Sequence, residues 1–269
     1  MGHYYTKDGE AQHEQATKAG AKNKTRPTTI ADARKLGLLP SVTTIFDVIS
    51  KPFLTEWQIG EALKAAYKCP PAELEDQETW IRKIREKATE QVTDAADLGT
   101  DVHAAIEAAL AGSEWDQMLE PYVTPALATI SALKATDASS EAITVNTEIG
   151  YAGCVDYSGW IGNGESLDGI PSVPLIADFK TKKTKVGEKI IPAETYVWQL
   201  AAYHVSRFGM TQREVHPYAR ACNIYISSTE PGRVETVWYD REQLVEAWEC
   251  FKAAHKLWCL RNKYDPTKE

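Results

Sequence analysis

The sequence lacks a long apolar run and a closely spaced pair of cysteines. No apolar stretch approaches the roughly 20 residues that a membrane-spanning helix needs, and no signal-peptide core stands at the N-terminus. The five cysteines include no C-x-x-C pair, which argues against a zinc or iron–sulfur centre and favours reduced thiols. We therefore expect a soluble cytoplasmic protein with no membrane partner and no iron–sulfur cluster.

An excess of positive charge is also missing. The 269 residues carry 38 acidic and 30 basic side chains, which gives a net charge of −8. A surface of this sign does not attract nucleic acid nonspecifically, so binding to a polyanion would need a local basic patch or acids neutralised by metal. With 43% hydrophobic residues and no internal repeat, the chain is long enough to bury a substantial core.

Hydrophobic periodicity divides the chain into a helical half and a mixed half. Residues 1–40 are polar and have no apolar period, so we expect a partly flexible N-terminal extension that is loosely structured or lies on the surface. Residues 41–135 have helical spacing, including a long segment from Glu78 to Ala111. Gly99 should bend or divide that long helix, because glycine in a helix interior costs about 1 kcal/mol relative to alanine.

Strands and helices alternate over residues 141–269. Runs of β-branched and aromatic residues predict two hairpins, the first of them closed by "NGESLDGIPS" at 163–172. A helix that ends at Gly209 separates the hairpins, and Asp240 caps a final helix. The predicted fold class is α+β, with a mixed central β-sheet flanked by helices and a helical N-terminal half.

Two acids stand at the predicted ends of neighbouring strands. Asp156 ends "GYAGCVD" and Asp178 ends "LIAD", so a hairpin would bring their carboxylates together. Close carboxylates repel unless a cation such as Mg²⁺ or Mn²⁺ lies between them. Lys180 shares the face of Asp178 because side chains in a strand repeat with period two. This trio suits metal-assisted hydrolysis of a phosphodiester, although an isolated D-x-K is more often a surface ion pair.

The order of the surrounding motifs carries a family resemblance. "GCVD" at 153–156, "DFK" at 178–180 and "QLAAY" at 199–203 together resemble the PD-(D/E)XK nuclease superfamily, in its RecB-like branch. "GTDVHAAIE" at 99–107 resembles the first motif of that branch, and the segment 39–57 resembles mitochondrial genome maintenance exonuclease and its phage relatives. The resemblance implies a restriction-endonuclease-like core within a single nuclease domain, whose extent would follow the division just described. That domain would comprise residues 41–269, with a helical part at 41–135 and the sheet core with its flanking helices at 141–269.

The resemblance also implies roles for individual residues. Asp156, Asp178 and the backbone carbonyl of Phe179 would be ligands of Mg²⁺ or Mn²⁺, with His103 as a further metal ligand. Lys180 would be the catalytic lysine. On its own, a histidine in an alanine-rich helix is more often a satisfied core or surface residue, so His103 depends on the other motifs.

Four further side chains have expected roles around this site. Gln199 and Tyr203, at i and i+4 on one helix face, would brace the site and contact the nucleic acid, although Tyr203 also suits a plain core position. Glu107 shares the face of His103 and either orients the imidazole or is solvated. Glu148 precedes the Asp156 strand and is a candidate outer metal ligand.

A basic strip follows the catalytic lysine. Lys182, Lys183 and Lys185 would bind the phosphate backbone of DNA without reading its sequence, the alternative being a solubilising loop. Trp57 and the basic part of the N-terminal segment are candidate guides for the strand.

These features favour a metal-dependent DNA exonuclease that hydrolyses single-stranded or duplex DNA from its ends with a metal-activated water. Phage relatives suggest a role in phage DNA replication, recombination or degradation, in the host cytoplasm if the protein is phage-encoded. A flap or junction endonuclease and a catalytically silent DNA-binding subunit are the alternatives. The sequence indicates no polarity, and it leaves the oligomeric state open, a monomer included.

Overall fold

A five-stranded mixed sheet forms the centre of the computed structural model, which describes residues 2–17, 23–162 and 172–268. The strand order is β5-β6-β7-β8-β9, and only β7 and β8 run parallel. The strands are β5 (Thr136–Asn146), β6 (Tyr151–Ile161), β7 (Val173–Lys182), β8 (Arg220–Ser227) and β9 (Val234–Tyr239). The predicted α+β class is confirmed, whereas the predicted connection at 163–172 falls almost entirely outside the described residues.

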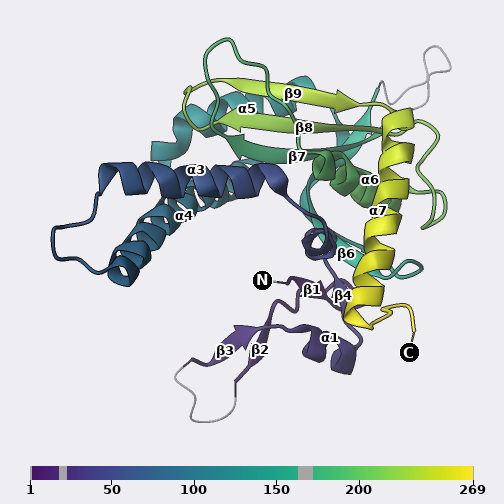
Figure 1. Cartoon of the computed structure of the whole chain (residues 1–269). Helices are drawn as coiled ribbons and strands as arrows, with labels where there is room; N and C mark the ends of the chain where they lie inside the picture. The colour runs from purple at the N-terminus through teal and green to yellow at the C-terminus, as the bar shows by residue number, and fades with distance from the viewer. Residues whose placement is uncertain (1, 18–22, 163–171, 269) are drawn as a thin grey trace.

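Helices cover both faces of this sheet (Figure 1). One face packs against α6 (Glu194–Phe208) and α7 (Arg241–Asn262), and the other against α5 (Glu120–Ala132) and the second half of α4 (Gln77–Leu110). A short 3₁₀ turn, η2 (Gln117–Leu119), leads into α5. Because side chains alternate along a strand, β7 sends Ile176 into the core beneath α6 and α7, while Leu175 and Ala177 enter the opposite core.

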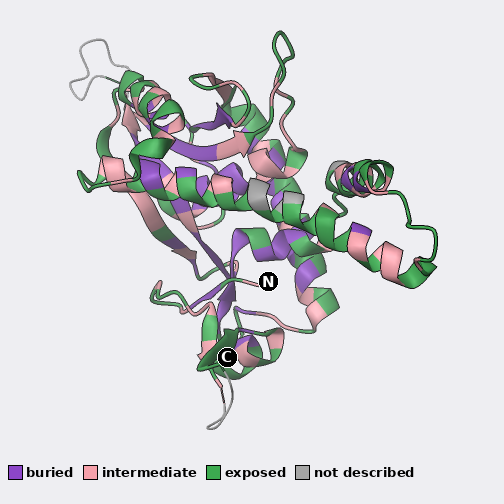
Figure 2. Cartoon of the chain, turned by 90° about the vertical axis from the view of Figure 1, so that its left-hand side faces the viewer, coloured by how far each residue is buried: buried purple, intermediate pink, exposed green. Residues whose placement is uncertain are grey.

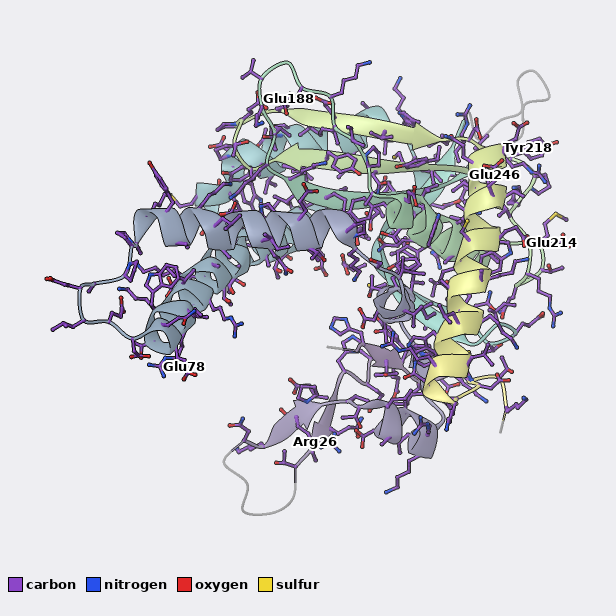
Figure 3. The ribbon with its side chains drawn as sticks, viewed as in Figure 1. Arg26, Glu78, Glu188, Glu214, Tyr218 and Glu246 are labelled. Atoms are coloured by element: carbon purple, nitrogen blue, oxygen red, sulfur yellow. The ribbon has the colours of Figure 1, made fainter. Side chains whose placement is uncertain are left out.

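The first half of the chain supplies a projecting helical arm. After α2 (Val42–Ile45), which Ser41 caps, and η1 (Phe46–Val48), the chain forms α3 (Pro52–Lys68), which packs against α4. This pair extends from the body, and most of its residues are exposed (Figures 1 and 2). Figure 3 shows Glu78 at the outer end of the arm.

Helix α4 continues through Gly99 without a break, so the expected division at that glycine is wrong. A side chain at this position would face Thr181 of β7, since an added Cβ would lie 3.8 Å from the Thr181 Cβ. The helix packs against β7 here, and that packing outweighs the roughly 1 kcal/mol helix-propensity cost of glycine.

The first 40 residues contain regular structure, contrary to the expectation of a loose segment. The segment forms β1 (Tyr4–Tyr5), β2 (Glu14–Ala16), β3 (Thr25–Pro27), α1 (Ile30–Leu36) and β4 (Leu39–Pro40). Strand β1 pairs with β4 and contacts β6, and both of its tyrosines are buried. The apolar residues of this segment are too few to show a period, yet they pack into the core formed by the rest of the protein. No helix in the described ranges is both long and apolar enough to cross a membrane.

We predict that Tyr4→Ala destabilises the whole fold. Tyr4 is only 4% exposed and packs in the core beneath α6 and α7, so its truncation leaves a cavity. The free energy of unfolding should fall by about 3 kcal/mol in urea titrations, whereas Lys7→Ala, an exposed change in the same segment, should leave it unchanged. Equal stability of the two variants would contradict the packing described for this segment.

Candidate functional site

The candidate site lies at a fork in the sheet, where strands β6 and β7 separate. The ladder between them runs from Ile161–Val173 to Tyr157–Ala177 and then ends, although β7 continues beside β8 as far as Lys182. Asp156 and Asp178 occupy the next position in the same register. Both acids therefore lie inside their strands, not at strand ends as the sequence predicted, and it is the separation of the strands that gives them space.

The fork leaves the backbone of Phe179 without its partner strand. In an antiparallel ladder, the N–H and C=O of one residue point to the same neighbouring strand, and here that strand has moved away. The Asp156 carboxylate takes its place, since its Oδ2 accepts the Phe179 N–H at 2.7 Å. Burial lowers the pKa of the His103 imidazole, and the nearby Phe179 carbonyl opposes part of this shift.

His103 reaches the fork from α4. Its Nδ1 lies 3.6 Å from Asp156 Oδ2, and its ring meets the Phe179 ring edge-on with centroids 5.8 Å apart. The imidazole thus touches both strands of the fork, as its predicted role requires. The packing of α4 around Gly99 on β7 positions this side chain, one turn further along the helix.

Lys180 neutralises Asp178 on the face of the sheet covered by α6. Its Nζ lies 2.6 Å from Asp178 Oδ2, as the period of two predicted, and 3.4 Å from Gln199 Oε1. It also lies over the Tyr196 ring, 4.9 Å from the centroid. An ammonium group held by a buried carboxylate, an amide and an aromatic face has little freedom to move.

Gln199 and Tyr203 brace this ammonium group from α6. The Gln199 amide donates to the Tyr203 hydroxyl at 3.1 Å, so the predicted i,i+4 pair is real. Both side chains are buried. Gly153 makes room for the tyrosine, because a Cβ at Gly153 would lie 2.5 Å from Tyr203 Cε1. The "GCVD" motif thus begins with glycine for a steric reason.

Burial and charge shift the ionisation of this cluster. Burial raises the pKa of Asp156, and the charge of Asp178 raises it further. Burial alone would lower the pKa of Lys180, but Asp178 and Asp156 outweigh that effect and raise it. For His103, burial is the largest effect and lowers the pKa, which leaves the imidazole neutral at pH 7. Neutral imidazole is the form that binds metal ions.

The donor set fits a divalent cation, although no three His, Cys, Asp or Glu side chains in the described ranges are arranged to hold one. A count of side chains leaves out the backbone, and the Phe179 carbonyl near His103 is a potential oxygen ligand. Lys180 pairs with Asp178, whereas Asp156 contacts the neutral His103 imidazole and the Phe179 N–H, so an ionised Asp156 has no cationic partner among the described residues. Carboxylates, a carbonyl and a neutral imidazole are the ligands that suit Mg²⁺ or Mn²⁺.

The structure does not bring Glu148 to the fork. It lies in the turn between β5 and β6, paired with Arg213, and the part of β6 from Tyr151 to Asp156 alone spans about 17 Å at roughly 3.3 Å per residue. Glu141 of β5 stands across from Asp156 instead, and its charge acts on both Asp156 and His103. A backbone φ of 48° marks the irregularity in β5 at Glu141, which sequence spacing does not reveal.

The sequence did not predict a role for two buried polar residues and a thiol that lie beside the fork. Asn223 of β8 donates to Asp178, and the Tyr239 hydroxyl donates to Asn223. The signal for Asn223 was an amide inside the apolar run "ACNIYIS". Cys154 donates its thiol hydrogen to Glu141. Burial raises the pKa of that thiol, and the charge of the exposed Glu107 adds a little to the rise. Glu107 makes no contact with His103 that would orient the imidazole.

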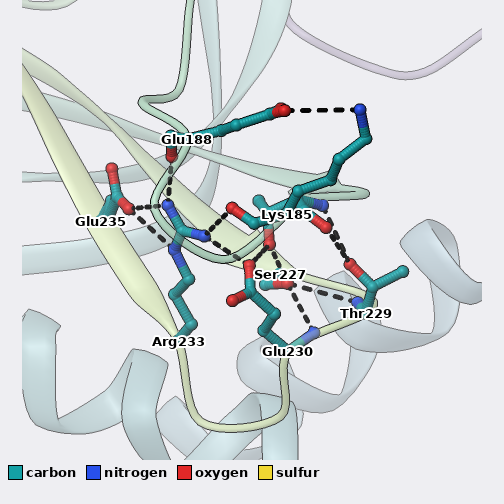
Figure 4. Close-up of polar contacts among 8 residues, drawn as sticks. Lys185, Glu188, Ser227, Thr229, Glu230, Arg233 and Glu235 are labelled. Carbon is teal, nitrogen blue, oxygen red and sulfur yellow. Dashed lines mark hydrogen bonds and ion pairs between the residues drawn. The ribbon is translucent and has the colours of Figure 1, made fainter.

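The predicted basic strip is an anchored loop between β7 and α6. Arg233 donates to the carbonyls of Lys185 and Glu188 and is itself paired with Glu230 and Glu235 (Figure 4). A hollow of about 200 Å³ is lined by residues 182–185 and 188–191 of the loop. Arg233 is thus committed to holding the loop, which leaves the lysines as its exposed cations.

The three predicted lysines differ in what they contact. Lys182 donates to the Ile191 carbonyl at 2.9 Å, and Lys185 pairs with Glu188 in an exposed ion pair. Lys183 is exposed, and its charge acts on Glu61 of α3. Glu61 and with it this part of α3 are thus within electrostatic range of Lys183. Trp57 is half-buried and lies one turn before Glu61 on the same helix face, outside the cluster at the fork.

Comparison with known proteins yields little. No family model matches the chain, and no curated protein matches it. Among solved structures, the crystal structure of SSO0001 is similar at 16% sequence identity, over 74% of this chain and 85% of that chain, with a TM-score of 0.25. A score of this size establishes neither a shared fold nor a shared activity.

We predict that Asp156→Asn stabilises the metal-free protein and removes its response to metal. Because burial, and then the charge of Asp178, raise the pKa of Asp156, ionising this carboxyl group opposes folding. The penalty is complete above the raised pKa and is lost as the pH falls from there to the ordinary carboxyl value. Asparagine keeps an oxygen for the Phe179 N–H. In EDTA the free energy of unfolding should rise by about 1 kcal/mol, a usual gain at a functional site.

Thermal melts recorded in EDTA and again with Mn²⁺ separate the effect of removing the charge from the effect of losing a metal ligand. Mn²⁺ should raise the melting temperature of the wild type and leave that of Asp156→Asn unchanged. Glu148→Gln removes an acid outside the fork and should retain the wild-type response. An equal Mn²⁺ response in Asp156→Asn and wild type would show that Asp156 holds no metal.

Proposed function

We propose that this protein is a metal-dependent deoxyribonuclease of the PD-(D/E)XK type that hydrolyses phosphodiester bonds from DNA ends. The observation that supports it best is the buried Asp178–Lys180 pair at the fork, with Lys180 Nζ 2.6 Å from Asp178 Oδ2 and a second acid in the adjacent strand. A structural ion pair needs no further acid beside it. A second buried carboxylate makes folding less favourable, and such a group is expected where a cation binds.

Four groups would hold the metal ion: Asp156, Asp178, the Phe179 carbonyl and His103. When bound, the ion supplies Lewis acidity to a phosphoryl oxygen and lowers the pKa of a water. The acids bind the ion from two strands, and His103 approaches from the side of α4. Burial of the cluster excludes bulk water, which strengthens each electrostatic interaction within it.

Lys180 is the group suited to orient the attacking water and to stabilise the charge that develops on the phosphate. Its ammonium group already lies against Asp178 and is held by Gln199, so little reorganisation is needed. Gln199 and Tyr203 act through Lys180 in this account, as positioning residues. Both side chains are buried in the described structure, so their contact with DNA stays a prediction.

The loop between β7 and α6, with its exposed lysines, gives this acidic protein a local positive surface that attracts DNA. Lys182 belongs to the same strand as Asp178 and Lys180, so the loop begins two residues beyond the proposed catalytic lysine. The exposed cations of a loop anchored by Arg233 can contact successive phosphates without reading bases. Helix α3, which carries Trp57 and lies within electrostatic range of Lys183 at Glu61, is a candidate surface for a strand.

Cleavage should require a divalent metal ion and Lys180. Linear single-stranded and duplex DNA should be degraded with Mg²⁺ or Mn²⁺ but not in EDTA, while covalently closed circles stay intact. Lys180→Ala should reduce kcat by about 100-fold or more, as loss of a group that stabilises developing charge does. Lys252→Ala on α7 is the matched control and should keep the wild-type rate. Near-wild-type turnover by Lys180→Ala would refute its catalytic assignment.

The substrates in this experiment also distinguish the alternatives. Cutting of closed circles would replace the exonuclease with a structure-specific endonuclease at the same site. Absence of cleavage with either metal would favour a catalytically silent DNA-binding subunit. The position of an end label among the products gives the polarity of digestion.

The lysines of the loop between β7 and α6 should contribute to DNA binding through their charge. Replacing Lys182, Lys183 and Lys185 together by alanine should weaken DNA binding in EDTA and reduce the slope of log K against log salt by roughly 2 for single strands. Replacing Lys35, Lys252 and Lys256 removes the same charge elsewhere and should change the slope far less. An equal loss in both triple variants would mean that DNA responds to net charge only.

A further inference from the structure

Asn223 is a buried amide in a strand that is otherwise apolar. It is 0% exposed, and its neighbours Cys222 and Ile224 are equally buried. An amide in such a place costs free energy unless its hydrogen bonds are made. Its Nδ2 donates to Asp178 Oδ2 at 2.9 Å, and its Oδ1 accepts the Tyr239 hydroxyl at 3.1 Å.

Three neighbouring strands place these groups in a row. The parallel register of β7 and β8 puts Asn223 directly beside Asp178. In the antiparallel register of β8 and β9, Tyr239 stands opposite Ala221, two residues before Asn223 and therefore on the same face. The tyrosine reaches the amide diagonally, a contact that long aromatic side chains can make across a sheet.

The chemistry of the three groups allows only one pattern of hydrogen bonds. An ionised carboxylate can only accept, so the amide nitrogen must face Asp178 and the amide oxygen must face Tyr239. The phenol must then donate, which requires its proton. Burial raises the pKa of Tyr239 to about 12, with a contribution from the charge of Asp178, so the hydroxyl stays protonated over the working range.

The two oxygens of Asp178 are thereby made different. Oδ2 receives both Asn223 Nδ2 and Lys180 Nζ, whereas no donor from the described ranges reaches Oδ1. A carboxylate held at one oxygen by two donors cannot rotate freely, so the other oxygen is fixed as well. Asn223 and Tyr239 have no other side-chain partners among the described residues that would explain this arrangement.

We propose that Asn223 and Tyr239 are positioning residues that fix the Asp178 carboxylate so that its Oδ1 is presented to the divalent cation. This inference rests on the proposed function, since it concerns the same metal ion. Neither residue touches the substrate or the ion. They raise the affinity for metal by removing the cost of ordering the carboxylate when the ion binds.

Calorimetric titration of Mn²⁺ into the full chain, without DNA, tests the proposal. Tyr239→Phe removes only the hydroxyl and should weaken Mn²⁺ binding several-fold, and Asn223→Leu should weaken it about 10- to 100-fold. Tyr225→Phe is the matched control, because that tyrosine is buried in the same sheet and its hydroxyl has no partner among the described residues. It should leave the affinity unchanged.

Kinetics give a second readout that a purely structural role would not produce. For Tyr239→Phe, the Mn²⁺ concentration at half-maximal rate should increase, while saturating Mn²⁺ restores kcat and the KM for DNA stays constant. Wild-type affinity for Mn²⁺ in both Tyr239→Phe and Asn223→Leu, in a wild type that binds metal and cleaves DNA, would overturn the proposal and leave the function intact. A wild type that neither binds Mn²⁺ nor cleaves would overturn both.

Discussion

The separation of β6 from β7 is the constraint on which the site depends. Where the ladder ends, one strand offers an N–H and a carbonyl to no neighbour, and the Asp156 carboxylate takes the place of the missing strand at Phe179. An acid is brought into the sheet by a backbone hydrogen bond and held near Asp178. The repulsion between the two is the reason that Lys180 and a divalent cation suit this place.

The remainder of the chain supports the fork from several directions. Helix α4 delivers His103, α6 delivers Gln199 and Tyr203, and β8 and β9 hold Asp178 from the far side. Even the N-terminal strand lies close to the cluster, because burial raises the pKa of Tyr5 to about 12 and the neighbouring Cys154 and Glu141 add to that rise. Segments distant in sequence thus meet at one buried cluster, which the packing of two cores keeps in position.

Local spacing predicted those parts of the site that depend on local geometry. The period of a strand places Lys180 beside Asp178, and the period of a helix pairs Gln199 with Tyr203. Asn223 could not be placed, because the register of parallel strands is set by a long crossover through α6 and not by a turn. An irregularity inside β5, invisible in the residue pattern, puts Glu141 near Asp156 and leaves Glu148 in the turn. The α+β class followed from the alternation of patterns, whereas the role of residues 1–40 depended on tertiary contacts.

The most direct test of the central claim is anomalous diffraction from a crystal of the wild-type protein soaked in Mn²⁺. The account predicts a manganese peak between Asp156 and Asp178, with Asp178 Oδ1 as a ligand and Oδ2 still bonded to Asn223. A fork without manganese, in a crystal whose exposed acids bind the ion, would show that the cluster is a structural ion pair.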